Sequence, residues 1–177
     1  MSDRPVACRI AFATCADLPS IQHDDAHLAA SLERLGIQPV SCTWNDPAVD
    51  WSMFDAVLIR TTWDYFRQHS AFITGLDRLD RLGSPTINYS RVLRWNSDKR
   101  YLLNLARHGV ANIPTRVVRA HALVYALAAM SAQPVVIPPT ISGGAWHTLR
   151  GDTDDAAFLQ AVARLPIELD YLVQPFV

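Results

Sequence analysis

The sequence FDAVLIR at residues 54–60 decides the fold, because it is a short and almost uninterrupted apolar run with the length of one strand. A strand that is apolar on both faces is typical of a parallel sheet, which helices cover on both sides. A polar segment follows, and residues 69–82 then carry Phe72, Ile73, Leu76, Leu79 and Leu82 at helical spacing. The pattern predicts a strand and helix of a parallel α/β fold.

The flanking sequence repeats this alternation. We expect strands at residues 8–14, 39–44 and 84–88, and a helix at residues 24–35 that ends at Gly36. Strands that alternate with helices predict a parallel sheet of about four strands. Its expected core residues are Ile10, Phe12, Val57, Leu58 and Ile59.

The sequence becomes more polar after Asn88, and we place a domain boundary near Ser90. Residues 1–90 are expected to form an α/β domain and residues 91–177 a smaller α+β domain. In the second half, the pattern predicts helices at 97–108, 120–131 and 154–165, and strands at 113–118, 134–137, 146–151 and 171–177. We expect an antiparallel hairpin among these strands.

The composition excludes several classes of function. The chain has 177 residues, 50% of them hydrophobic, with a net charge of −1 and a pI near 6.6. No global field draws it onto nucleic acid or an anionic membrane, so small molecules are the expected partners. The apolar stretch at residues 6–13 is too short for a signal peptide. Cys8, Cys15 and Cys42 form no CxxC pair, which argues against disulfides and zinc and favours a reducing cytoplasm.

Polar and aromatic side chains follow the 54–60 strand: Arg60, Thr61, Trp63, Asp64 and Tyr65. Loops at the carboxyl ends of parallel strands hold ligands, so this segment is a candidate substrate loop. The Arg60 guanidinium could bind a carboxylate, and the Asp64 carboxylate could bind an ammonium. The rings of Trp63 and Tyr65 could exclude water around them. The alternative is a polar connection whose Trp63 and Tyr65 pack onto the core.

A second candidate site combines Lys99, the only lysine, with the small-residue loop Ser142, Gly143 and Gly144. A cation in the first turn of a helix opposes the helix dipole, and a nearby anion would offset that mismatch. Adjacent glycines let backbone amides approach a phosphate. The alternatives are a solvated lysine paired with Asp98 or Asp155, and a plain hairpin turn.

Four segments together resemble the ATP-grasp superfamily of ATP-dependent carboxylate–amine ligases. They are DAVLIRTTWDYFRQ at 55–68, Ile87-Asn88 with WNSDKRYLLNLARHGVANIPT at 95–115, PTISGGAWHTLR at 139–150, and the terminal YLVQPFV. Within the superfamily, the chain is similar to the glutathione-synthetase-like group, which includes the cyclo-ligase of the D-cycloserine pathway. The resemblance implies a pre-ATP-grasp domain that holds substrate, followed by the smaller lobe of the ATP-grasp domain.

The resemblance also implies chemistry. Members use ATP and Mg²⁺ to phosphorylate a substrate carboxylate, and an amine then displaces the phosphate to form a C–N bond. The substrate implied here is a small amino-acid-like carboxylate. The nucleotide-binding positions that the resemblance assigns are Lys99 and Arg150, the lid at Ser142, Gly143 and Gly144, and the adenine hinge at Gln174 and Phe176.

Two departures from the family pattern keep a second interpretation open. Pro138 stands where members usually have a second phosphate-binding lysine, and the family's second lobe, which carries the Mg²⁺ ligands, is not in this sequence. We therefore assign no catalytic residue and no metal ligand, and expect the N-terminal part of a ligase. The alternative is a non-catalytic relic that binds a small molecule or nucleotide.

Two further expectations concern association and class. If a lobe is missing, Leu172, Val173 and Phe176 form an uncovered apolar end, which favours self-association as a homodimer. A response-regulator-like domain is a third alternative. It requires acidic residues at the strand ends, where this sequence has Thr14-Cys15 and Arg60-Thr61.

Overall fold

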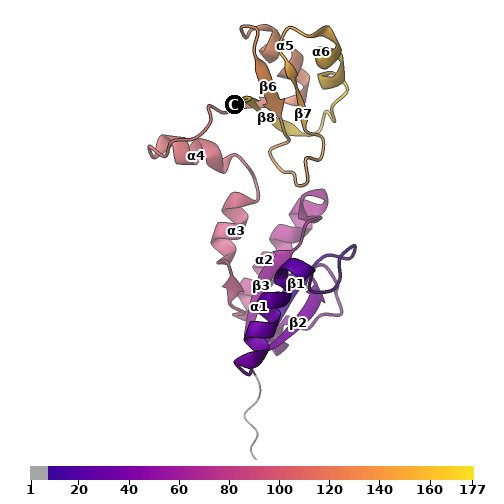
Figure 1. The fold of residues 1–177 in the computed structure, drawn as a ribbon, viewed down its shortest axis with the longest axis vertical. Coiled ribbons are helices and arrows are strands. Elements are labelled where there is room, and N and C mark those ends of the chain that lie inside the picture. Colours follow the sequence, from indigo (N-terminus) through magenta and orange to yellow (C-terminus); the bar gives the residue numbers. More distant parts are fainter. Residues whose placement is uncertain (1–7) are drawn as a thin grey trace, which may run out of the picture. The chain divides into compact units, whose positions relative to one another are not determined.

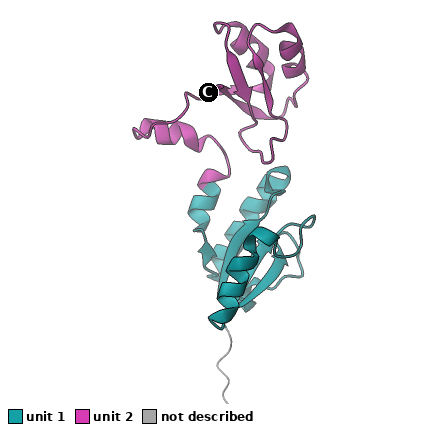
Figure 2. Ribbon diagram, in the orientation of Figure 1, with its two compact units in different colours: residues 1–94 teal, residues 95–177 magenta. Residues whose placement is uncertain are grey.

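The computed structural model describes residues 8–177 and divides into two compact units, one ending at Arg94 and the other running from Trp95 to Val177 (Figures 1 and 2). Residues 1–7 of the expected first domain lie outside the described residues. Within residues 8–177, none of the helices has the length and apolar character needed to cross a membrane.

The first unit is built on a parallel sheet of four strands in the order β2-β1-β3-β4, so the predicted parallel sheet is confirmed. The strands are β1 (Arg9–Thr14), β2 (Gln38–Thr43), β3 (Ala56–Thr61) and β4 (Thr86–Ile87). The helices are α1 (His23–Arg34) and α2 (His69–Leu82), with short 3-10 turns at Trp51–Met53 and Tyr65–Gln68, and α3 (Ser90–Asn96) begins in this unit and ends in the second.

Alternation along the strands divides the core between the two faces of this sheet. Ala11, Ala13 and Val57 pack with the α2 residues Phe72 and Leu76 in one buried cluster. Phe12 is buried too, but it points to the opposite face, because successive strand residues alternate. Arg60 also belongs to that face and reaches Asp25 of α1, so α1 and α2 cover opposite faces.

Of the expected core residues, Phe12 and Val57 are fully buried. Ile59 is partly buried and packs against the α2 cluster. Ile10 and Leu58 are only half-buried. Each face of the sheet thus has one fully buried residue of this set, Val57 on the α2 side and Phe12 on the opposite side.

The second unit contains an antiparallel sheet in the order β5-β8-β6-β7. The predicted antiparallel hairpin is its β6–β7 pair. The elements are α4 (Tyr101–Arg107), β5 (Arg116–Arg119), α5 (Leu123–Ala128) after a 3-10 turn at Ala120–Ala122, β6 (Pro134–Ile137), β7 (Leu149–Asp152), α6 (Ala156–Val162) and β8 (Asp170–Pro175). Helices α5 and α6 pack on one face, where Tyr171, Val173 and Ile137 are buried among their side chains.

The expected helix at 97–108 is confirmed only over α4, because residues 97–100 form a turn instead of the first helical turn. The Lys99 backbone N–H donates to the Thr140 carbonyl at 2.7 Å, and the Arg100 N–H donates to the Asp98 carboxylate at 2.9 Å. These two N–H groups bond to a distant loop and to a nearby side chain, and so they make no hydrogen bonds within a helix.

The expected strand at 146–151 is also shorter, since the observed strand begins at Leu149. Ala145 and His147 have φ of 59° and 50°, and strand geometry requires negative φ. The helices predicted at 120–131 and 154–165 are shorter than expected at both ends. Helix α6 begins after Asp155, whose carboxylate accepts the Ala157 N–H at 2.9 Å.

The expected uncovered end of the last strand is corrected as well. Leu172 and Val173 are 0% and 3% exposed. Phe176 is the exposed member of the three, and its ring lies under the Arg150 guanidinium. Two of the three residues of the expected apolar end are thus buried.

Candidate functional site

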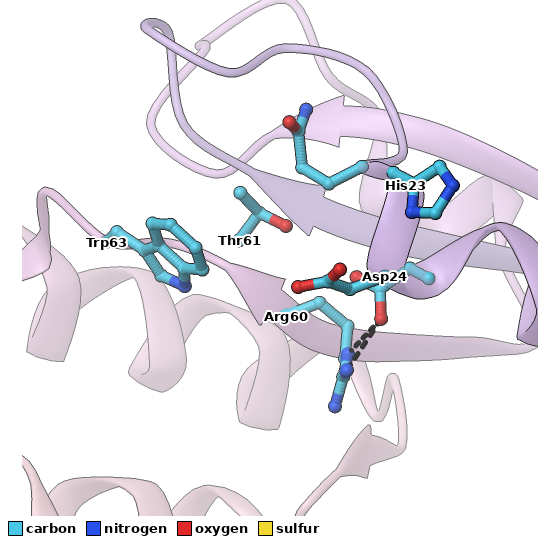
Figure 3. Close-up of a pocket in the computed structure, with 7 residues that line it drawn as sticks. His23, Asp24, Arg60, Thr61 and Trp63 are labelled. Atoms are coloured by element: carbon cyan, nitrogen blue, oxygen red, sulfur yellow. Dashed lines mark hydrogen bonds and ion pairs between the residues drawn. The ribbon is translucent and has the colours of Figure 1, made fainter.

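A cavity of about 210 Å³ lies at the carboxyl end of β3, where the sheet meets the first turn of α1 (Figure 3). Its lining residues come from the start of α1 and from the end of β3 with the loop after it: Gln22, His23, Asp24, Asp25, Arg60, Thr61 and Trp63. Parallel strands direct their carboxyl ends to one edge, so the topology places this cavity where such sheets bind ligands.

Arg60 and Asp25 form an ion pair in this cavity. The guanidinium Nε donates to Asp25 Oδ1 at 2.8 Å, and the Asp25 side chain is 6% exposed against 46% for Arg60. The hydrogen bond to Asp25 raises the pKa of Arg60 above its ordinary value, although partial burial opposes that shift. The arginine charge is therefore already compensated inside the protein.

The other polar groups of the cavity leave it negatively charged. Thr61 is 3% exposed, and its hydroxyl makes no hydrogen bond to any of residues 8–177 while it points into the cavity (Figure 3). Asp24 lies beside it, and Trp63 forms the rim with 64% of its surface exposed. Two carboxylates and one guanidinium give an excess of one negative charge.

Asp64 and Tyr65, also expected in the substrate loop, lie elsewhere. Asp64 accepts a hydrogen bond at 2.7 Å from the indole Nε1 of Trp44. The Tyr65 ring packs 5.2 Å from the Phe72 ring, between centroids, at the edge of the core. The segment therefore divides, with Arg60, Thr61 and Trp63 at the cavity and the next two residues turned toward the core.

In the second unit, the Lys99 ammonium lies against the 139–142 turn. Its Nζ donates to the Ser142 carbonyl at 2.9 Å, to the Ser142 hydroxyl at 2.5 Å and to the Pro139 carbonyl at 3.3 Å. Burial lowers the pKa of Lys99, although Asp98 opposes the shift. The alternative ion pairs of Lys99 with Asp98 or Asp155 do not form, because Asp98 binds Arg100 and Asp155 caps α6.

The glycine loop follows that turn and has unusual backbone geometry. Gly144 has a φ of 56°, Ala145 continues in the left-handed region, and the Trp146 N–H closes the turn on the Gly143 carbonyl at 3.0 Å. Non-glycine residues with positive φ carry a conformational cost, and such residues cluster at ligand-binding loops.

The other expected nucleotide-binding residues meet on the sheet face that points away from α5 and α6. Val136 of β6 is paired across the sheet with Arg150 on one side and Gln174 on the other. The Arg150 guanidinium carbon lies 3.4 Å from the centroid of the Phe176 ring. Gln174 Nε2 donates to the Thr115 hydroxyl at 2.8 Å.

Comparisons with known proteins agree with this architecture. The N-terminal domain family of the D-cycloserine synthetase DcsG matches residues 10–88. The cycloserine biosynthesis protein DcsG of Streptomyces lavendulae is 37% identical over 109 residues, which are 62% of this chain and 36% of that protein. The crystal structure of D-cycloserine synthetase DcsG superposes with a TM-score of 0.82 and 33% identity over 96% of this chain and 59% of that one.

A RimK domain ATP-grasp protein from Sphaerobacter thermophilus has the same fold, with a TM-score of 0.69 and 20% identity over 96% of this chain and 64% of that one. These matches support the interpretation that the chain is similar to the N-terminal portion of an ATP-grasp ligase. The chain spans 59% of the length of the cycloserine synthetase and 36% of the curated relative.

The residues of the second unit fit a phosphate better than a metal. Lys99, the Ser142 hydroxyl and the exposed Gly144 lie in one loop region, and a Cβ at Gly144 would meet nothing within 4 Å, so an anion has room to approach. Pro138 follows β6 and supplies no second cation. Among residues 8–177, no three His, Cys, Asp or Glu side chains gather as a metal site.

The sequence interpretation missed the contribution of α1 to the first cavity. It assigned no site residue to the start of this helix, where Gln22, His23, Asp24 and Asp25 line the cavity. A signal was present, because an arginine at the end of a buried strand needs a counter-charge, and an acidic pair opens a helix of the same sheet. Which carboxylate supplies that charge depends on the tertiary packing.

Proposed function

We propose that this chain supplies the substrate-holding and phosphate-contacting parts of an ATP-dependent ligase that joins a small amino-acid-like carboxylate to an amine. The observation that carries the proposal is the half-buried ammonium of Lys99 against the Ser142 turn, without a carboxylate partner among residues 8–177. A desolvated cation beside a glycine loop suits an anionic ligand. The similarity to cycloserine synthetase supports the same activity class.

The proposed reaction has two steps. A carboxylate oxygen of the substrate attacks the γ-phosphorus of ATP, so that the bond to ADP breaks and an acyl phosphate forms. The amine nitrogen then attacks the acyl carbon, phosphate leaves with its bridging oxygen, and the nitrogen gives up a proton. Mg²⁺ would neutralise developing phosphate charge. We assign no Mg²⁺ ligand to this chain.

Lys99 would contact the phosphates by exchanging partners. Its three hydrogen bonds now go to oxygens of Pro139 and Ser142. A phosphate oxygen would replace one or more of them, while the amides of Gly143 and Gly144 cover the ligand. The purine ring would lie on the Val136 side of the sheet, between Arg150 and Gln174, with Phe176 at its edge.

The first cavity is proposed to hold the ammonium end of the substrate. Arg60 forms its ion pair with Asp25, and Asp24, which forms no ion pair with any of residues 8–177, replaces Asp64 as the proposed ammonium ligand. The Thr61 hydroxyl and the Trp63 ring would complete the contact, the latter through a cation–π interaction. Binding by the ammonium end leaves the carboxylate free to react.

Calorimetry on the 177-residue chain tests the two halves of the proposal separately. Lys99→Met should weaken ATP binding by about tenfold or more, because a hydrogen bond to a charged group contributes about 1.5–3 kcal/mol. Ser131→Ala, an exposed serine of the same unit, is the matched control and should leave the affinity unchanged. Equal ATP affinities for the lysine variant and wild type would refute the phosphate assignment.

The amine assignment uses alanine and N-acetylalanine, which lacks the ammonium. Asp24→Asn should weaken alanine binding about tenfold and leave the N-acetyl compound unaffected, whereas the exposed control Asp17→Asn should change neither titration. Identical binding of both compounds to wild type would overturn this part.

The second candidate function is a small-molecule binding protein without ligase activity, and Pro138 in place of a phosphate lysine favours it. Under this alternative, alanine binds with Asp24 dependence while ATP binding is absent. The two titrations therefore separate the candidates without an activity assay.

A further inference from the structure

A second groove lies on the opposite side of the first unit from the Arg60 cavity. It has a volume of about 470 Å³ and is lined by residues 44–47, directly after β2, and by one side of α2. The α2 residues recur at helical spacing, with Thr74, Gly75, Arg78 and Arg81 all facing the groove. Small-molecule sites usually have volumes of 300–1,000 Å³, so this one has the size to hold a ligand.

Gly75 is the unexpected residue of this groove. It lies inside the 14-residue helix α2, where glycine is about 1 kcal/mol less favourable than alanine. A Cβ built on it would meet only Cε3 of Trp44, at the ordinary contact distance of 3.9 Å, and its backbone φ is not positive. Neither crowding nor backbone geometry requires glycine here. What its missing side chain provides is open space above Trp44.

The floor of the groove is aromatic and apolar. Trp44, Gly75 and Arg78 also line a smaller cavity of about 50 Å³ that reaches Trp51 and Phe72 in the core. Cε3 of Trp44 is the atom nearest to the Gly75 position, and the Trp44 and Phe72 rings are nearly perpendicular, at 82°, with centroids 5.6 Å apart. The edge of an indole is the positive part of its quadrupole and favours the face of another aromatic ring.

The rim of the groove is cationic. Arg78 Nη2 donates to the Val49 carbonyl at 3.3 Å, and Arg81 Nε donates to the Asp77 carbonyl of its own helix at 3.3 Å. Neither guanidinium forms an ion pair within the described part of the chain. Asp46 is the acidic group of the lining, and its Oδ1 accepts the Ala48 N–H at 2.8 Å. Two guanidiniums and one carboxylate leave a net positive rim.

We propose that this groove is a binding site for a small aromatic anion, separate from the substrate and nucleotide sites. The ring of the ligand occupies the space above Gly75 against the edge of Trp44, and its carboxylate or phosphate accepts hydrogen bonds from Arg78 and Arg81. Trp44 also donates to Asp64, whose neighbour Trp63 lines the first cavity. A ligand in the groove thus contacts a side chain that is linked to the substrate loop.

The probes are indole-3-acetate, phenyl phosphate and the uncharged control indole-3-acetamide, titrated into the full chain without ATP. Nuclear magnetic resonance should show amide shift changes at residues 44–47 and along α2. The two anions should bind at least tenfold more tightly than the acetamide. Equal binding of acetate and acetamide, or no shift changes at millimolar probe, would refute the proposal.

Gly75→Ala is the most informative variant, because it should raise the stability of the protein and at the same time abolish binding at the site. The added methyl group favours the helix and should raise Tm by about 2–4 °C, while it fills the space above Trp44 and abolishes probe binding. Arg78→Gln with Arg81→Gln should lower the anion affinity about tenfold, and the exposed control Arg34→Gln should not. Wild-type binding by the stable Gly75→Ala protein would overturn the assignment.

Discussion

Replacing Arg60 with methionine should destabilise the first unit through Asp25. The Asp25 side chain is 6% exposed and bonds to the Arg60 guanidinium at 2.8 Å, so the variant leaves a buried carboxylate without its counter-charge. Breaking a fully buried ion pair costs about 3–5 kcal/mol. Because Arg60 is 46% exposed and the cavity admits water, we expect a smaller loss of about 2 kcal/mol in the free energy of unfolding.

Urea unfolding, followed by circular dichroism, measures this loss, and the slope of the transition should stay unchanged. Asp25→Asn combined with Arg60→Met should cost less than Arg60→Met alone, because the pair then holds no uncompensated charge. Arg34→Met, on the exposed end of α1, is the control. If the Arg60 and Arg34 variants unfold at the same urea concentration, Asp25 does not depend on Arg60 and the reasoning fails.

Three further predictions test other contacts. Gly151→Ala should destabilise the second unit by about 1–3 kcal/mol in urea unfolding, because its Cβ would lie 2.5 Å from the Phe158 ring; an unchanged transition would show that the ring moves aside. Reductive ¹³C-methylation of Lys99, the only lysine, should give a side-chain signal that titrates below the ordinary lysine pKa, since burial lowers it; an ordinary pKa would contradict the burial. Burial raises the pKa of Tyr171 to about 12, so stability should be fully present below pH 10 and fall by about 2–3 kcal/mol as pH rises toward 12; Tyr171→Phe should remove that fall, and an equal fall in both proteins would refute its origin.

The sequence predicted best where structure depends on local pattern. The stripe of Phe72, Leu76 and Leu79 predicted a helix at 69–82, and α2 has those bounds, with Gly83 as its C-cap. Such a helix is specified by its own periodicity and its stop signal, so little tertiary information is needed. The parallel sheet followed from the same kind of evidence.

Prediction failed where distant segments compete for a backbone or side-chain group. The residues around Lys99 have helical composition, yet the Lys99 N–H bonds to Thr140, 41 positions away. Asp64 has the charge expected of a substrate ligand, yet Trp44 binds it across 20 positions. Neither partner can be identified from spacing, because each contact forms only after the loops have packed.

In both predicted sites the charged group already has protein partners, and this determines how ligands can bind. Arg60 is neutralised by Asp25, and Lys99 donates to oxygens of Pro139 and Ser142. A ligand must therefore replace existing hydrogen bonds, so the free energy of binding is a difference between two sets of contacts of similar strength. Lys99 makes this measurable. Its present partners are neutral oxygens, and a phosphate is anionic, so ATP binding at this site should raise the pKa of Lys99 from its lowered value, and a ligand bound elsewhere should leave it unchanged.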